Sequence, residues 1–150
     1  MRAGSDRPGP EHLSVYGSLL LRGAIAAASA DDRPAALGLL EEASDAANRL
    51  GQDGNFYWTA FGPVNVLLHR VHVATRLGDA GTALAYAAKI SPELVTVAER
   101  RASLWLDMAQ AYLQRRWAEQ AVTALRAEPG RPRTAGSSSP KAARAAGTYT

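Results

Sequence analysis

The chain has 150 residues, 47% of them hydrophobic, and a formal net charge of +3. This length allows one domain of ordinary size with a real core. The sequence has no cysteine, which excludes disulfides and cysteine-ligated metals and fits a reducing, cytoplasmic location. No segment reaches the roughly 18–20 apolar residues that span a bilayer.

The positive charge is confined to the end of the chain. Four basic residues and no acid follow Pro129, so residues 1–128 hold thirteen Lys and Arg against fourteen Asp and Glu, a balance of −1. Residues 128–150 also lack an apolar stripe, which predicts a basic, low-complexity, disordered tail. Non-specific nucleic-acid binding through this tail is an open alternative, and it predicts a steep dependence on salt.

The chain begins with a polar stretch, residues 1–12, which contains two prolines. We expect it to be a disordered lead or linker before a domain of residues 13–127. Residues 13–30 have two interpretations. The leucine run and the small residues up to Ala30 are typical of a signal peptide, but Arg22 interrupts the apolar region. An amphipathic helix fits better, with a stripe formed by Leu20, Gly23, Ala24 and Ala27.

A second helix should follow the turn at residues 30–34. Asp32 is a plausible N-cap, Pro34 is tolerated in the first turn, and Gly51 takes the position that ends a helix. The expected apolar face of this helix consists of Ala36, Leu37, Leu40, Ala43, Ala47 and Leu50.

Residues 51–62 form an irregular segment with four aromatic residues: Phe56, Tyr57, Trp58 and Phe61. Such a cluster could be a binding site. We instead expect a hydrophobic plug under neighbouring helices, because four exposed aromatic side chains in one patch would be costly for a soluble monomer.

The next helix pair should begin at Pro63, a residue favoured at the first helical position. Gly78 should end the first helix of this pair, and Asp79 should cap the second. The expected buried residues of the pair are Val64, Leu67, Leu68, Val71, Ala74, Ala83, Leu84, Ala87 and Ile90.

The third pair, from about residue 96 to 127, contains the spacing that indicates the fold. Trp105, Met108 and Tyr112 share one helical stripe, and Ala109 leaves room for close packing. With Ala121, Leu125 and Pro129, these residues follow the tetratricopeptide pattern W-x2-L-G-x2-Y … A-x3-F … P.

The same pattern can be laid on the two earlier pairs. The small-residue markers Ala36, Ala83 and Ala121 are 47 and 38 residues apart, whereas a regular array repeats every ~34 residues. The predicted fold class is therefore all-α: a degenerate tetratricopeptide-like solenoid of about three antiparallel helix pairs with disordered ends.

No enzyme is expected, because no motif assembles catalytic residues. His69 and His72 can share a helix face, but they have no cysteine partner and no carboxylate one turn away on the same helix, so no metal site is predicted. The glycines form neither a dinucleotide fingerprint nor a phosphate-binding loop, and no cofactor is predicted.

The expected functional surface is the concave groove that the first helices of tetratricopeptide pairs line. Its lining should be rich in amides, mildly basic and partly apolar, which suits a peptide, a small-molecule effector or a partner protein. The predicted contact residues are Asn65, His72, Arg76, Ser103, Gln110 and Gln114, with Ser18, Leu21, Ile25, Leu68 and Leu106 also facing the groove.

Four segments carry a more specific resemblance: WTAFGPVNV (58–66), LLHRV (67–71), LGDAG (77–81) and VAERRASL (97–104). Over about residues 13–127 the chain resembles the C-terminal half of actinobacterial XRE-family helix-turn-helix transcriptional regulators. The resemblance implies a tetratricopeptide-like domain that senses an effector or mediates assembly, including a possible homodimer.

The family's DNA-binding domain would precede residue 1. The resemblance therefore implies DNA binding only through a domain that this chain lacks, as in a truncated regulator, with no membrane partner. The alternative is a stand-alone tetratricopeptide protein–protein interaction module.

Overall fold

The computed structural model describes residues 7–55 and 59–127, and within these ranges the protein is all-helical. The elements are α1 (Pro10–Ser29), α2 (Arg33–Leu50), α3 (Pro63–Arg76), α4 (Ala80–Ala87), a 3-10 turn (Pro92–Leu94), α5 (Ala98–Gln114) and α6 (Ala118–Ala127). The only β-type contact among the described residues is an isolated bridge between Gly54 and Phe61. The all-α prediction is confirmed.

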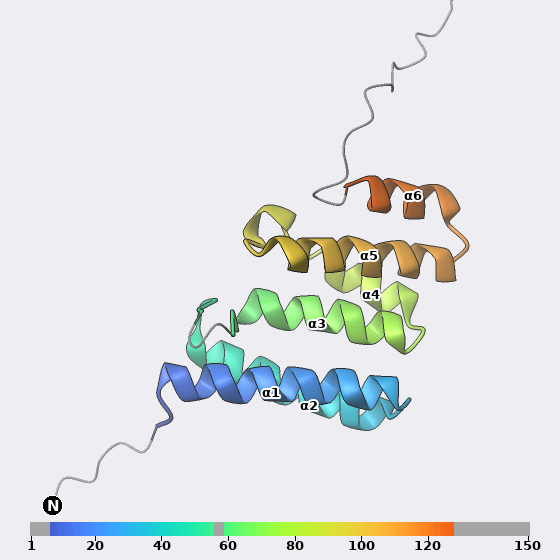
Figure 1. Cartoon of the computed structure of the whole chain (residues 1–150). Helices are drawn as coiled ribbons and strands as arrows, with labels where there is room; N and C mark the ends of the chain where they lie inside the picture. Colours follow the sequence, from blue (N-terminus) through green and yellow to red (C-terminus); the bar gives the residue numbers. More distant parts are fainter. Residues whose placement is uncertain (1–6, 56–58, 128–150) are drawn as a thin grey trace, which may run out of the picture.

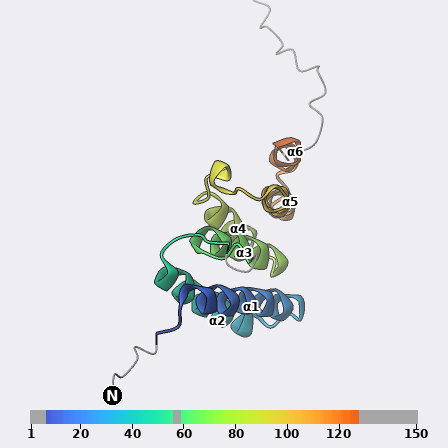
Figure 2. The same cartoon turned by 60° about the vertical axis from the view of Figure 1, so that its left-hand side comes forward.

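The helices pack in consecutive pairs. α1 packs on α2, α3 on α4, and α5 on α6, while α3 also contacts both α1 and α5. Figure 1 shows α1, α3 and α5 lying side by side, with α2 and α4 behind them. Figure 2 shows the pairs following one another from α1 and α2 to α6. The assignment of this arrangement to a tetratricopeptide solenoid stays a prediction.

Local signals placed most helix ends correctly. Asp32 caps α2, because its Oδ1 accepts a hydrogen bond of 3.1 Å from the backbone N–H of Ala35. Gly51 and Gly78 end their helices with φ of 80° and 78°, a left-handed conformation in which glycine has no steric penalty. Pro63 opens α3 as expected.

The start of the first helix was predicted wrongly. α1 begins at Pro10, so the last three residues of the expected disordered lead, 1–12, are helical. The physical reason is that proline at the first helical position has the right φ and lacks only an N–H that would be unpaired there. Residues 1–6 and the predicted tail at 128–150 lie outside the described residues.

Asp79 has a different role from the predicted N-cap. It makes no capping hydrogen bond to α4, and its carboxylate instead pairs with the guanidinium of Arg33 at the start of α2. Arg33 also donates a hydrogen bond to the carbonyl oxygen of Leu77. Arg33 therefore ties the second helix pair to the first.

Three clusters of buried residues form the core. The first joins α1, α2 and α3, the second joins α3, α4 and α5, and the third joins α5 and α6. Alanine dominates all three, and Ala36, Ala83 and Ala121 are each at most 1% exposed. Small residues at these contacts let helices approach closely. Leu37 departs from the predicted apolar face of α2, because its side chain is 45% exposed.

Phe61 is the one described member of the aromatic cluster, and it is completely buried. Its ring lies against Gly17 of α1, so closely that a side chain there would overlap it. Phe61 therefore behaves as the predicted plug, while the other three aromatic residues lie outside the described residues. Of the described helices, none is both long and apolar enough to cross a membrane.

Candidate ligand-binding groove

Two adjacent cavities lie along the helices that begin each pair. The first, of about 210 Å³, is lined by residues of α1, α3 and α5: Ile25, Asn65, Leu68, His69, His72, Arg100, Ser103, Leu104 and Asp107. The second, of about 290 Å³, lies beside residues 53–55, residue 60 and residues 94–97. The cavities share Asn65, Leu68 and Arg100, so these residues form the wall between them.

Asn65 is the most unusual group in this wall. The residue is only 4% exposed, and its Oδ1 is buried without a hydrogen-bond partner among the described residues. A buried polar atom left unpaired costs about 1–3 kcal/mol. Asn65 lines both cavities, but the Oδ1 atom itself is covered, so an N–H or O–H group of a bound molecule would pair with it after the side-chain amide turns toward one of the cavities.

His69, one turn along α3, presents a second acceptor. Its Nδ1 lies 2.9 Å from the carbonyl oxygen of Asn65. A carbonyl only accepts, so Nδ1 carries the proton and the neutral ring keeps a lone pair on Nε2. Burial lowers the pKa of His69, and the nearby positive charge of Arg100 lowers it further. The neutral ring is therefore the stable form in the groove.

The burial of His69 predicts a specific pH dependence. Its folded-state pKa lies below the ordinary value of 6.5, so below about pH 6.5 the unfolded chain binds more protons than the folded one. The free energy of unfolding should therefore be fully retained above that pH and fall as the pH drops below it. His69→Gln should flatten this dependence in urea titrations, and His12→Gln, at an exposed position, should not. A profile unchanged by His69→Gln would show that His69 is not buried in its neutral form.

His72 and Asp107 join α3 to α5 across the first cavity. His72 Nδ1 lies 2.9 Å and 3.1 Å from the two carboxylate oxygens of Asp107. The side chain of Asp107 is 12% exposed and that of His72 is 34% exposed. The ring is thus fixed by its Nδ1–H, and its Nε2 remains available on the other side.

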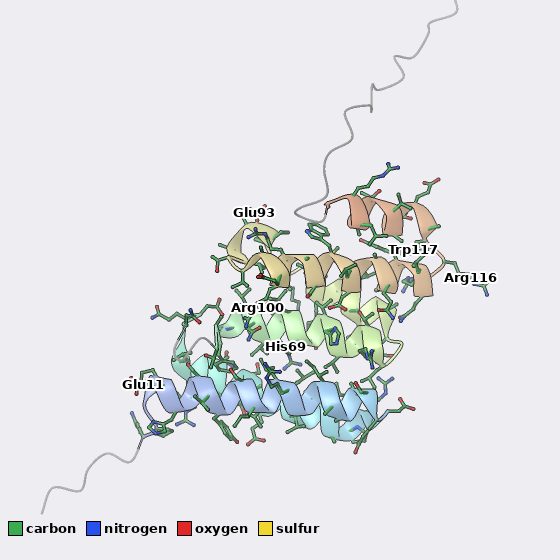
Figure 3. All side chains as sticks on the ribbon, in the orientation of Figure 1. Glu11, His69, Glu93, Arg100, Arg116 and Trp117 are labelled. Carbon is green, nitrogen blue, oxygen red and sulfur yellow. The ribbon has the colours of Figure 1, made fainter. Side chains whose placement is uncertain are left out.

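Arg100 lies in the wall between the cavities and binds the loop that precedes α3. Its guanidinium donates hydrogen bonds to the carbonyl oxygens of Ala60, at 2.8 Å, and Thr59, at 3.0 Å. Burial lowers the pKa of Arg100, and the carboxylate of Asp53 partly opposes this effect. In Figure 3, His69 lies between α1 and α3 and Arg100 lies between α3 and α5.

Ser103, His72 and Asp107 are the residue types of an acyl-transfer triad, and all three line the first cavity. The hydroxyl of Ser103, however, donates to the backbone carbonyl of Glu99 at 2.9 Å. A nucleophilic serine instead directs its hydroxyl to the histidine that removes its proton. The described contacts therefore fit a binding surface better than this catalytic arrangement.

The structure brings together three of the six predicted contact residues. Asn65, His72 and Ser103 line the first cavity. Arg76 instead donates a hydrogen bond to the hydroxyl of Ser29, and Gln114 donates one to the carbonyl oxygen of Thr75. Gln110 is exposed on α5. These three lie outside the cavity linings, because they are nearer the C-terminal ends of α3 and α5 than the residues that line the first cavity.

Sequence reasoning missed Arg100, Asp107 and the second acceptor, His69. A signal for Asp107 did exist: it is an acidic residue one turn from Ser103, and it interrupts the apolar run of residues 104–109, where an unpaired charge would be costly. The predicted lack of a metal site was argued from the same helix alone, whereas the carboxylate near His72 comes from α5. Within residues 7–55 and 59–127, no group of three or more potential ligands is placed to hold a metal ion.

A scan of the chain against protein-family models, and searches of curated proteins and of solved structures, found no match.

Proposed function

We propose that this protein is a ligand-binding helical-repeat domain of the tetratricopeptide kind, which takes a peptide or small-molecule effector in the groove of α1, α3 and α5. The packing of the helices in consecutive pairs supports the repeat assignment. A binding role is favoured over an enzymatic one by the hydrogen bond that diverts the hydroxyl of Ser103 to Glu99.

The observation that carries this proposal is the unpaired Oδ1 of Asn65. Buried polar side chains are almost always hydrogen-bonded, so an exception needs an explanation. Its position on the wall shared by two cavities gives one: the missing partner is a group of the ligand, which the amide meets by turning into a cavity. Preorganised acceptors of this kind favour a ligand that matches them and disfavour one that leaves them unpaired.

The polar groups define the chemistry of the ligand. Asn65 Oδ1 and the Nε2 atoms of His69 and His72 are acceptors when the rings are neutral, so the ligand should present N–H or O–H donors to them. Ile25, Leu68 and Leu104 line the same cavity and would contact an apolar part of the ligand. The backbone amides and side chains of a short peptide have this composition, as does a small apolar molecule with an amide or hydroxyl group.

The resemblance to XRE-type regulators supports a role as the effector-binding half of a transcriptional regulator. In such a role the ligand would act by linkage: it would favour one arrangement of α1, α3 and α5 and so bias an attached DNA-binding domain. The alternative function is a stand-alone module for binding partner proteins. Leu94, which is 65% exposed and lines the second cavity, favours it by offering an apolar contact at the rim.

The first test of this proposal needs no ligand. Asn65→Leu should raise the free energy of unfolding of the free protein by about 1–2 kcal/mol, because it removes a buried acceptor with no partner. The measurement is urea unfolding followed by circular dichroism. Asn48→Leu, at an exposed position of α2, should change the free energy by less than about 0.5 kcal/mol. A destabilised Asn65→Leu variant would mean that the amide is already satisfied.

The second test uses ligand libraries. Tripeptides and donor-bearing small molecules would be screened separately by the shift in Tm of the full chain, because ligands that bind only the folded state raise Tm. Asn65→Leu should weaken any hit by about ten-fold or more, the effect of one buried hydrogen bond. Arg76→Ala should leave binding unchanged, because Arg76 lies outside both cavities. A hit that is insensitive to Asn65→Leu would refute the site.

A further inference from the structure

The outward stripe of α1 is apolar at its centre and exposed to solvent. Leu19 is 63% exposed and Val15 is 39% exposed, and Tyr16, at the edge of the stripe, is 45% exposed. Together with Pro8, Glu11, His12, Leu13 and Arg49, these residues line a shallow surface groove of about 650 Å³. Burying such side chains against another surface would be favourable.

The stripe has a helical spacing that suits a second helix. Its members are Pro8, Glu11, His12, Val15, Leu19, Arg22 and Ala26. Apart from the adjacent pair at positions 11 and 12, they recur every three or four residues and so lie along one face of α1. All except Pro8 lie within the helix, and all are exposed. The opposite face carries the buried residues Leu13, Leu20, Ala24 and Ala28.

The charges on this stripe are arranged symmetrically about its apolar centre. Glu11 lies one turn before Val15, and Arg22 lies three residues after Leu19. If a second α1 lay antiparallel with the twofold axis near Gly17, Val15 would face Leu19 of the other copy. The same register would bring Glu11 of each copy beside Arg22 of the other. Figure 3 shows Glu11 near the outer end of α1.

From this self-complementarity we propose that the protein associates with a second copy of itself through antiparallel α1 helices, with an apolar Val15–Leu19 centre and two Glu11–Arg22 pairs. The interface is isologous, so each contact occurs twice. Its apolar centre, Val15 and Leu19, lies on a different face of α1 from Ile25, which lines the groove. Arg22 lies at the groove side of the stripe, where its charge reaches His69. The dimer is independent of the proposed ligand-binding function.

The association should be weak. The stretch from Glu11 to Arg22 extends only about 16 Å at 1.5 Å per residue, and stable interfaces bury about 800 Å² on each partner. An interface of this length lies at the small end of the range or below it, so the dimer should form only at high protein concentration. Low ionic strength should strengthen it, because exposed ion pairs are screened by salt.

A charge-swap experiment on the full chain tests both the surface and its register. Glu11→Arg alone places like charges opposite each other, and so does Arg22→Glu alone, so each variant should be monomeric by sedimentation velocity where the wild type is dimeric. An equimolar mixture of the two variants should dimerise again, because both ion pairs re-form between unlike chains. The mixture should recover the wild-type dissociation constant to within about three-fold.

Two controls keep the outcome decisive. Asp45→Arg makes the same charge change as Glu11→Arg at an exposed position of α2, and it should leave the dimer intact. Circular dichroism melting should show that every variant is folded. A monomeric wild type at the highest soluble concentration would overturn the proposal. So would single variants that still dimerise, or a mixture that stays monomeric.

Discussion

Replacing Gly17 with alanine is expected to lower the free energy of unfolding by about 1–3 kcal/mol, the typical range for overpacking a tight contact. A Cβ at this position would overlap the ring of Phe61, and Phe61 is fully buried in the first core cluster. The ring could escape only by moving the loop that Arg100 holds through the carbonyl oxygens of Thr59 and Ala60. Equilibrium urea unfolding measures the effect.

Gly38→Ala is the matched control for this prediction. Gly38 lies inside α2, and no neighbouring atom lies within 4 Å of the place that a Cβ would take. Alanine should therefore stabilise the helix by about 0.5–1 kcal/mol. The two substitutions are chemically identical and should have opposite signs. If Gly17→Ala also stabilised the protein, the contact between α1 and Phe61 would be wrong.

A double-mutant cycle makes the cause explicit. Phe61→Ala alone should cost about 3–5 kcal/mol, because it leaves a cavity in the core. In that background Gly17→Ala has no ring to meet, and its cost should disappear. If the double variant is less destabilised than the sum of the two single variants, the effect of Gly17→Ala is due to its contact with Phe61. Additive effects would assign it to the helix itself.

The second large effect should come from Ala83→Leu. Ala83 is fully buried in the second core cluster, where α4 meets α3 and α5. A leucine there has no space, so either its rotamer is strained or the helices separate, at a cost of about 2–3 kcal/mol. The prediction is a lower urea midpoint, with the slope of the transition indicating whether the folded state has loosened.

Ala85→Leu serves as the control on the same helix. Ala85 is two residues away and exposed, so the same substitution should change the free energy of unfolding by less than about 0.5 kcal/mol. Equal effects at both positions would mean that helix propensity, and not packing between helices, sets the stability of α4. That outcome would also weaken the interpretation of Ala36, Ala83 and Ala121 as close-packing positions.

Parts of the groove could be predicted from the sequence and others could not. Asn65 and His72 line one cavity, as the periodicity of a single helix, α3, predicts, and their contact with a ligand stays a prediction. Arg76 and Gln114 share that periodicity on their own helices, but each is engaged elsewhere, with Ser29 and with Thr75. Periodicity gives the side of a helix that a residue faces. It does not say which neighbour is within hydrogen-bonding reach at each end.

The sequence by itself determined the helices and most of their ends. Asp32, Gly51, Pro63 and Gly78 act through bonds and dihedral angles within a few residues, so their effects are visible in a short stretch of sequence. Only the tertiary structure decided that Asp79 pairs with Arg33 and that Asp107 pairs with His72. These partners are 46 and 35 residues apart, and they meet because of how whole helices pack, which no local pattern specifies.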